Sequence, residues 1–259
     1  MEKRAFIGVG HGGKDPGAVA NGFEEADLNL AIALACRTEL VRHGVTVGMS
    51  RTKDENDELK DEIQECNAFK PALAVDIHNN AGGGDGAEAF HHYGGGVGKT
   101  LAVNILDEIV KAGQNSRGAK TRKNSNGKDY YGFIRQTNAP AVIVECAFVD
   151  NKKDIQCIGT AAEQKAMGVA IAKGILKTLG VAWQEPTVTL ELPVLNKGMK
   201  CAAVEAVQVL LTAATDHDLA PDGSFGGKTE DATEDYQKEN GLPVTGIVDK
   251  ATWSNLLGV

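Results

Sequence analysis

The chain has 259 residues, of which 42% are hydrophobic; this is enough to bury a sizeable core and excludes a globally disordered protein. The formal net charge of −8 lies almost wholly in the C-terminal part, because residues 1–181 hold 22 Lys and Arg against 23 Asp and Glu, whereas residues 182–259 hold 5 against 12. Sequence-independent binding to phosphates rests on Lys and Arg, so this balance argues against nucleic acid as a partner.

The first 180 residues alternate between apolar strands and helices. Residues 5–10 (AFIGVG) predict a buried strand that ends in a glycine-rich turn, and Leu28, Ile32 and Ala35 predict the helix that follows. In chain order, strands are expected at 5–10, 45–49, 73–77, 87–93 and 141–148, and helices at 25–43, 56–69, 98–113 and 160–179. This alternation indicates an α/β domain over residues 1–181, built on a mostly parallel twisted sheet flanked by helices.

The character of the sequence changes after Gly180. Residues 182–194 contain two prolines and no helical period, which is typical of a linker. Helices are expected at 199–214, 229–240 and 249–257, so residues 195–259 are predicted to form a small three-helix module. Two segments of this module, 223–229 and 246–252, share a spacing of Gly, apolar residue and Thr, which indicates a weak internal repeat with a helix N-cap in each copy.

The cysteines and the apolar runs of the sequence indicate in which compartment the chain folds. The five cysteines are an odd number without a CxxC pair, which argues against a disulfide framework. No apolar stretch is long enough to span a bilayer, so no membrane partner is expected. The apolar run at the N-terminus ends within a few residues at His11, so it predicts a strand rather than the core of an export signal.

Four side chains stand out as candidates for chemistry, and Glu24 is a further candidate beside one of them, Glu25. His11 directly follows the first predicted strand, His78 follows the third, and Glu25 opens the first helix. Ligands of open α/β sheets bind beyond the carboxyl ends of the strands, where these side chains can converge. Two imidazoles and one carboxylate are a common ligand set for catalytic zinc. Glu145 lies inside an apolar strand, where an ionised carboxylate is costly without a partner such as a metal-bound water.

Each of these residues also has a plainer interpretation. A single histidine after a strand, such as His11 or His78, is more often a capping or hydrogen-bonding residue than a ligand. Glu25 suits the first turn of a helix through its charge alone. Glu145 is equally compatible with a structural ion pair to a buried arginine.

A histidine pair and a basic stretch are two further clusters of polar side chains. His91 and His92 are adjacent in a predicted strand, so their side chains point to opposite faces and are expected to be structural or to line a cleft. The basic stretch is expected to be a solvated loop, with a contact to substrate carboxylates as the alternative; it comprises Arg117, Lys120, Arg122, Lys123 and Lys128.

Four segments together resemble a known family. They read VGHGGKDPGA, GFEEADLNLAIA, AVDIHNNA and PAVIVECAFVDN, and they follow the order of the Amidase_3 family of zinc amidases, whose pattern is roughly GHGGxDxGA, GxxEKxxxLxxA, SIHxNA and PxxLVExGFxxN. The resemblance covers about residues 4–180. It implies a sheet-centred α/β domain, a Zn²⁺ ion held by His-Glu-His, and hydrolysis of the lactyl amide that joins muramic acid to L-alanine.

Carried over to this chain, the resemblance implies His11, Glu25 and His78 as zinc ligands and Glu145 as the catalytic residue. The register favours Glu25, which stands three residues after Gly22, and leaves Glu24 as the fallback.

Some positions depart from the family's pattern. Asp76 stands where serine is usual, and Cys146-Ala147 replaces Leu-Gly or a similar pair. Glu62 and Cys66 occupy positions often held by arginine and alanine. No ligand is lost, so these departures affect the packing around the site rather than its ligand set.

The tail resembles the family of peptidoglycan-binding three-helix modules. The matching segments over residues 195–259 are DGSFGGKT, TEDATEDYQKENGL and VTGIVDKATWSNLL. We therefore expect a peptidoglycan hydrolase, with a zinc peptidase acting on the stem peptide, a deacetylase or a non-catalytic wall-binding protein as alternatives. We also expect it to be made in the bacterial cytoplasm without a signal peptide and to act at the cell wall as a phage or prophage lysin, or else as a sporulation enzyme.

Overall fold

The computed structural model describes residues 3–186 and 191–258. It divides the chain into two compact units, Met1–Glu185 and Pro186–Val259, each of which has its own hydrophobic core. Residues 187–190 of the predicted linker at 182–194 lie outside the described residues. Among the described residues, no helix combines the length and the apolar character needed to cross a membrane.

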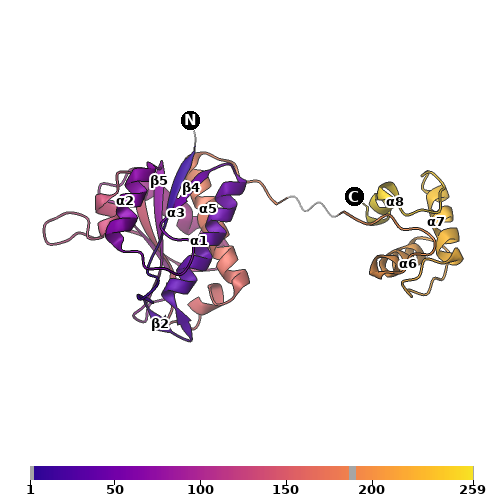
Figure 1. Ribbon diagram of the computed structural model, residues 1–259, viewed down its shortest axis with the longest axis horizontal. Coiled ribbons are helices and arrows are strands. Elements are labelled where there is room, and N and C mark those ends of the chain that lie inside the picture. The colour runs from indigo at the N-terminus through magenta and orange to yellow at the C-terminus, as the bar shows by residue number, and fades with distance from the viewer. Residues whose placement is uncertain (1–2, 187–190, 259) are drawn as a thin grey trace. The chain divides into compact units, whose positions relative to one another are not determined.

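The first unit is built on a six-stranded sheet in the order β4-β1-β5-β8-β6-β7 (Figure 1). Its strands are β1 (Arg4–Val9), β4 (Thr46–Met49), β5 (Leu73–Asn80), β6 (Ala87–His91), β7 (Ser116–Lys120) and β8 (Ala141–Phe148). All neighbours are parallel except β6 and β8, which confirms the mostly parallel α/β sheet. The reversal has a simple cause: only residues 81–86 join β5 to β6, which is too short for a crossover, so β6 starts at the edge where β5 ends.

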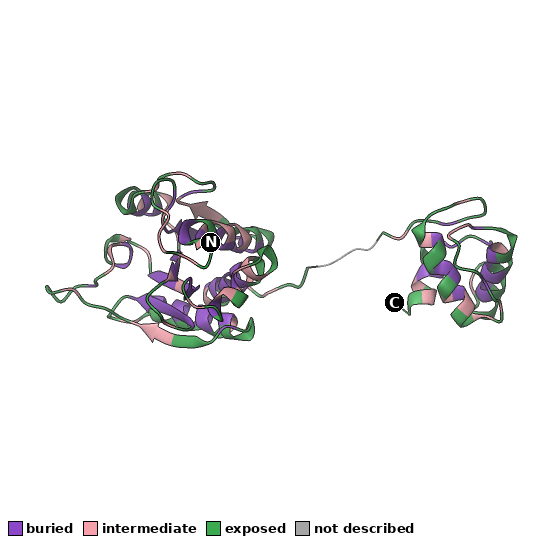
Figure 2. Cartoon of the chain, turned by 90° about the horizontal axis from the view of Figure 1, so that it is seen from below, coloured by how far each residue is buried: buried purple, intermediate pink, exposed green. Residues whose placement is uncertain are grey.

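Helices cover both faces of this sheet. On one face, α1 (Glu25–Arg42), α3 (Val97–Lys111) and α5 (Ala161–Leu179) pack over the larger core cluster. On the other face, α2 (Leu59–Phe69) and the short α4 (Gly132–Gln136) enclose a smaller cluster that includes Phe6 and Phe133. Three short elements complete the unit: β2 (Val19–Ala20), β3 (Phe23–Glu24) and the 3₁₀ turn η1 (Asp154–Cys157). Figure 2 shows the buried residues gathered between these layers.

The two faces of β1 differ in a way that matters for the site. Ile7 and Val9 are fully buried in the larger core, whereas Gly8 and, just after the strand, Gly10 alternate with them and face the opposite side of the sheet. A Cβ atom at Gly8 would lie 1.9 Å from Glu62 Oε1, and one at Gly10 would lie 2.1 Å from His78 Cε1. The two glycines therefore leave the space into which polar side chains from α2 and β5 extend.

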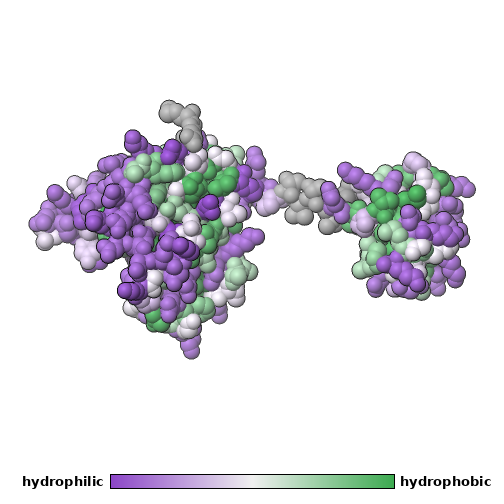
Figure 3. All heavy atoms as spheres, viewed as in Figure 1, coloured by the Kyte–Doolittle hydropathy of each residue, from purple (hydrophilic) through white to green (hydrophobic). Residues whose placement is uncertain are grey.

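The second unit contains α6 (Ala202–Ala214), α7 (Gly227–Glu239) and α8 (Lys250–Leu257). Their apolar faces meet in a core that includes Leu195, Phe225 and Trp253. In Figure 3, hydrophilic side chains cover much of the visible surface of each unit, with apolar patches between them. The three helices confirm the predicted module, although α6 begins three residues later than expected.

The predicted internal repeat corresponds to a repeated amide contact. Gln208 on α6 accepts a hydrogen bond from Gly223 N and donates to Ser224 O and Thr229 Oγ1. Gln237 on α7 accepts from Gly246 N and donates to Ile247 O and Thr252 Oγ1. Each buried glutamine thus joins the glycine turn of its repeat to the start of the next helix.

Replacing Gln237 by alanine should destabilise the second unit by about 2 kcal/mol, because the buried donors and acceptors of the 245–247 turn lose their partner. Hydrogen exchange of the slowest amides of α7, measured on the full chain, reports this free energy. Glu239, an exposed residue two positions later on α7, supplies the control. Glu239→Ala should change the free energy of unfolding of this unit by less than about 0.5 kcal/mol. Equal protection in both variants would contradict the role assigned to Gln237.

Candidate metal centre and active site

Three of the four candidate residues meet at the carboxyl ends of β1 and β5. His11 Nε2 lies 3.3 Å from Glu25 Oε1, and His78 Nδ1 lies 3.0 Å from the same oxygen. The imidazole rings stand edge to face with their centroids 5.1 Å apart. One ligand atom from each residue lies within 4.8 Å of the others, and within residues 3–186 and 191–258 no other group of His, Cys, Asp and Glu meets this condition. The geometry suits one cation with two nitrogen ligands and one oxygen ligand.

His11 is positioned by the glycine-rich turn that follows β1. Its backbone adopts the left-handed region with φ 63°, an uncommon conformation for a residue with a side chain. The turn closes through hydrogen bonds in both directions between the backbones of Gly12 and Asp15. Asp15 Oδ2 lies 2.8 Å from His11 Nδ1, so Nε2 is the nitrogen that faces Glu25.

Glu25 is the first residue of α1 and its side chain is buried. Oε2 accepts a hydrogen bond from Ala18 N at 3.0 Å, and Oε1 accepts one from Asn79 N at 3.1 Å. Burial raises the pKa of this carboxyl, but the hydrogen bonds from His11 and His78 outweigh it and hold the pKa well below its usual range. Glu25 is therefore a preformed, ionised carboxylate. Glu24, the fallback, is exposed on β3.

His78 lies within β5, because the strand runs three residues beyond its predicted end at residue 77. Its two ring nitrogens face different carboxylates: Nδ1 faces Glu25, and Nε2 lies 3.3 Å from Asp76 Oδ2. Burial lowers the pKa of this imidazole, but the negative charge of Asp76 and the two hydrogen bonds raise it well above the ordinary value. Burial, followed by the charge of Asp76, likewise raises the pKa of the neighbouring Glu62 well above its ordinary value.

Glu145 stands beside this group on β8. It is the cross-strand partner of His78 in the parallel β5–β8 pair, so the two side chains share one face of the sheet. No ion pair to an arginine is present among the described residues, in contrast to the structural alternative raised by the sequence. Burial raises the pKa of the Glu145 carboxyl to about 7. A carboxyl with such a pKa can accept and release a proton near neutral pH.

The pKa of Glu145 has a measurable effect on the metal-free chain. Between the ordinary value of 4.5 and about 7, the folded chain binds a proton at this group that the unfolded chain has lost. The free energy of unfolding should therefore fall as the pH rises through this window, by at most about 3 kcal/mol from Glu145. Thermal unfolding in chelator should show that Glu145→Gln gains stability relative to the wild type from pH 5 to pH 8. The exposed Glu24→Gln serves as the control, and a difference between Glu145→Gln and the wild type that does not vary with pH would contradict this.

Several supporting residues were not predicted from the sequence. Arg51 is 2% exposed and donates hydrogen bonds to the backbone oxygens of Val9, Gly10 and Ala26, at 3.1, 3.2 and 2.7 Å. It thus joins the end of β1 to the start of α1. Asn29 donates to Gly10 O and accepts from Asn79 Nδ2. These contacts use backbone oxygens and side-chain amides that are distant in sequence, so no motif or spacing in the sequence predicts them.

The other predicted clusters stay outside the metal group. His91 Nδ1 bonds to the backbone of His92, whose Nε2 lies 3.1 Å from Asp129 Oδ2. The basic stretch is only partly a loop, since Arg117 and Lys120 lie on β7 and pair with Glu88 at 2.7 and 2.5 Å. The prediction of a loop was wrong here because β7 is an edge strand without an apolar pattern. The other three members of the stretch, Arg122, Lys123 and Lys128, are exposed.

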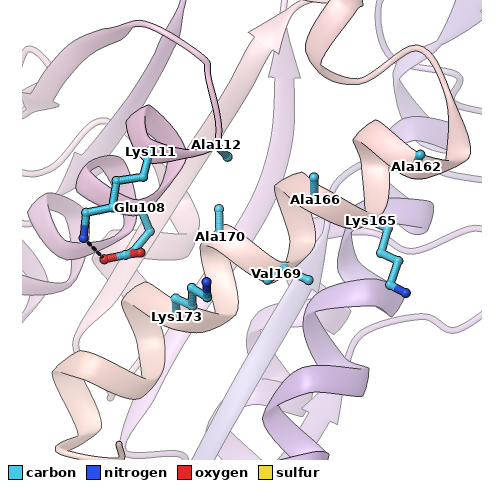
Figure 4. A pocket seen from close by; sticks show the side chains of 9 residues that line it. All are labelled: Glu108, Lys111, Ala112, Ala162, Lys165, Ala166, Val169, Ala170 and Lys173. Carbon is cyan, nitrogen blue, oxygen red and sulfur yellow. Dashed lines mark hydrogen bonds and ion pairs between the residues drawn. The ribbon is translucent and has the colours of Figure 1, made fainter. Parts of the chain in front are cut away.

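Two hollows differ in chemistry. A cavity of about 260 Å³ adjoins the metal group and is lined by His11 and His78 on one side and by Tyr131 and Phe133 on the other. A hollow of about 380 Å³ lies between α3 and α5, where Figure 4 shows short alanine side chains flanked by lysines. Among the residues shown, only Glu108 carries a carboxylate, and it pairs with Lys111. The chemistry therefore belongs to the first cavity.

Residues 6–177 match the family model described as N-acetylmuramoyl-L-alanine amidase. The chain belongs to this family. Amidases of this family are hydrolases that act on peptidoglycan, and residues 202–256 of this amidase match a family of peptidoglycan binding domains. Both matches fall within the segments whose resemblance was identified from the sequence.

Individual relatives and solved structures agree with this family assignment. The amidase is 33% identical over 183 residues to N-acetylmuramoyl-L-alanine amidase CwlM of Bacillus licheniformis, covering 69% of this chain and 70% of that one. It is 34% identical over 195 residues to the endolysin of Bacillus phage SPP1, covering 70% and 69%. Among solved structures, Cwp6 from Clostridium difficile is similar with a TM-score of 0.68 and 39% identity, covering 69% of this chain and 30% of that one.

Proposed function

We propose that the chain uses zinc to hydrolyse the amide bond between N-acetylmuramic acid and L-alanine in peptidoglycan, in the manner of an endolysin. The observation that supports this most directly is the convergence of His11, Glu25 and His78 beside Glu145. We further propose residues 1–181 as the catalytic domain, 182–194 as a linker and 195–259 as the peptidoglycan-binding domain. We propose a phage or prophage lysin, with a sporulation enzyme as the alternative, since the SPP1 endolysin is 34% identical to this chain and a sporulation-specific amidase of Bacillus subtilis is 33% identical.

The residues present fit a zinc ion. One ligand atom from Glu25 and one from each imidazole lie within 4.8 Å of one another, a spacing that a single cation can bridge. The remaining nitrogen of each imidazole bonds to a carboxylate, Asp15 for His11 and Asp76 for His78, which is the arrangement usual for histidine ligands of zinc. Three protein ligands leave a further position open, as in catalytic zinc sites. A bound zinc ion would supply Lewis acidity that polarises the scissile carbonyl and makes water a better nucleophile.

The proton transfers fall to Glu145. Its carboxylate would accept a proton from the attacking water and then deliver it to the nitrogen of the departing L-alanine, which leaves as a free amine. The register that places Glu145 next to His78 brings this carboxylate to the edge of the metal group. Because it lies on a central strand rather than a loop, its position is fixed by the sheet.

Mass spectrometry of purified peptidoglycan, digested with and without a chelator, tests the proposal. We expect free stem peptides that begin with L-alanine, their loss on chelation and their return when zinc is added. Cuts within the stem peptide or release of acetate would replace the proposal with a peptidase or a deacetylase. An absence of any product on several wall types would favour a wall-binding protein.

A further inference from the structure

Asp76 contacts the edge of His78 that faces away from the metal group. The two residues stand two positions apart on β5, so their side chains lie on the same face of the strand. Asp76 Oδ2 lies 3.3 Å from His78 Nε2. The opposite nitrogen, Nδ1, lies 3.0 Å from Glu25 Oε1. The imidazole is therefore held between two carboxylates, one inside the metal group and one behind it.

The carboxylate behind the ring is deeply buried. Asp76 is 2% exposed, and Glu62 of α2, whose carboxyl lies beside it, is 5% exposed. Both side chains lie over Gly8, where a Cβ atom would be 1.9 Å from Glu62 Oε1 and 2.9 Å from Asp76 Oδ1. These two oxygens have no hydrogen-bond partner among the described residues. Burying two carboxyl groups in this way is costly, so the contact with His78 is what compensates Asp76.

The two histidines of the site are not supported equally. Asp15, which bonds to His11, has a side chain that is 68% exposed, whereas the Asp76 side chain is 3% exposed. A hydrogen bond in a buried, low-dielectric place constrains its partner more strongly than one at the surface. An imidazole that donates from Nε2 carries its lone pair on Nδ1, the nitrogen that faces Glu25.

We propose that Asp76, backed by Glu62, is a positioning residue that fixes the tautomer and orientation of His78 for metal binding. The inference rests on the proposed function, because it takes His78 as a ligand. Asp76 does not contact the reacting atoms and acts only through His78.

Zinc affinity of the full chain, measured by competition with a chromophoric chelator, tests the inference together with ¹⁵N NMR of the histidine rings in the metal-free protein. In alkaline solution, where the ring is neutral, we expect His78 of the wild type to carry its proton on Nε2. Asp76→Ala should weaken zinc binding by about 10- to 100-fold and shift the ring towards the other tautomer. Asp76→Asn keeps an acceptor oxygen of the same shape, so it should preserve the tautomer and recover most of the affinity.

Asp57→Asn is the matched control. Asp57 lines the same cavity, and its replacement removes the same charge from a side chain that has no contact with His78. It should leave the zinc affinity within about two-fold. Affinity and tautomer unchanged in Asp76→Ala would overturn the inference, and so would a loss in Asp57→Asn as large as that in Asp76→Ala. A wild type that binds no zinc would refute the proposed metal chemistry, whereas the tautomer comparison would still decide whether Asp76 orients His78.

Discussion

Replacing Glu145 by glutamine should leave one zinc ion bound per chain and lower amide hydrolysis by about 10²- to 10⁴-fold, the range typical of a lost general base. Glutamine has the shape of the native side chain but cannot accept the proton of the attacking water. Because Glu145 lies beside the metal group and not within it, the ligands stay in place. Release of L-alanine-terminated peptides and the zinc content of the purified variant are the two measurements.

The control for this variant is Glu88→Gln on the neighbouring strand. Glu88 is the cross-strand partner of Glu145 on the other side, but its carboxylate is held by Arg117 and Lys120. We expect Glu88→Gln to retain more than about a tenth of the activity. A Glu145→Gln protein without zinc would show that this side chain is a ligand, and full activity in it would assign the proton transfer elsewhere.

The second large effect is expected at Glu25. Glu25→Gln replaces a buried anionic ligand by a neutral amide and should weaken zinc binding by more than the 10- to 100-fold that is typical when a residue supporting a ligand is changed. Hydrolysis should fall in parallel and recover in part when zinc is added in excess. Chelator competition gives the affinity, and peptide release at several zinc concentrations gives the recovery.

Glu24→Gln is the natural comparison, since it makes the same change one residue earlier on an exposed side chain. Its zinc affinity should stay within about two-fold of the wild type. If Glu24→Gln instead weakens zinc binding strongly and Glu25→Gln leaves it unchanged, the ligand is Glu24. The register taken from the family pattern would then be wrong by one residue.

The larger elements could be predicted because their patterns are long. The apolar strands at the centre of the sheet and the helices α1, α3 and α5 were placed within a few residues of their ends. The strand β7 was missed because it is an edge strand without an apolar pattern, and the helix α4 was missed because its five residues are too few to show a helical period. The reversed direction of β6 also escaped prediction, since it depends on the length of a connection rather than on the pattern within the strand.

At the site, sequence position suggested His11, His78, Glu145 and either Glu24 or Glu25, and the resemblance to the family favoured Glu25. The fold brings His11, Glu25 and His78 together. Their roles as ligands and as a base remain predictions. The side chains that support them were invisible in the sequence for a physical reason: a buried arginine such as Arg51 or a carboxylate such as Asp76 becomes meaningful only when a partner distant in sequence is in place.

Two glycines, one in β1 and one directly after it, limit how this protein can be engineered for heat resistance. Replacing glycine by alanine is a common way to stabilise a protein, because it reduces the conformational entropy of the unfolded chain by about 0.4–1 kcal/mol. At Gly8 and Gly10 the added methyl group would instead displace Glu62 or the His78 ring. Thermostable variants sought by removing flexible residues should therefore keep both glycines, since stiffening this strand would be achieved at the expense of the ligand geometry.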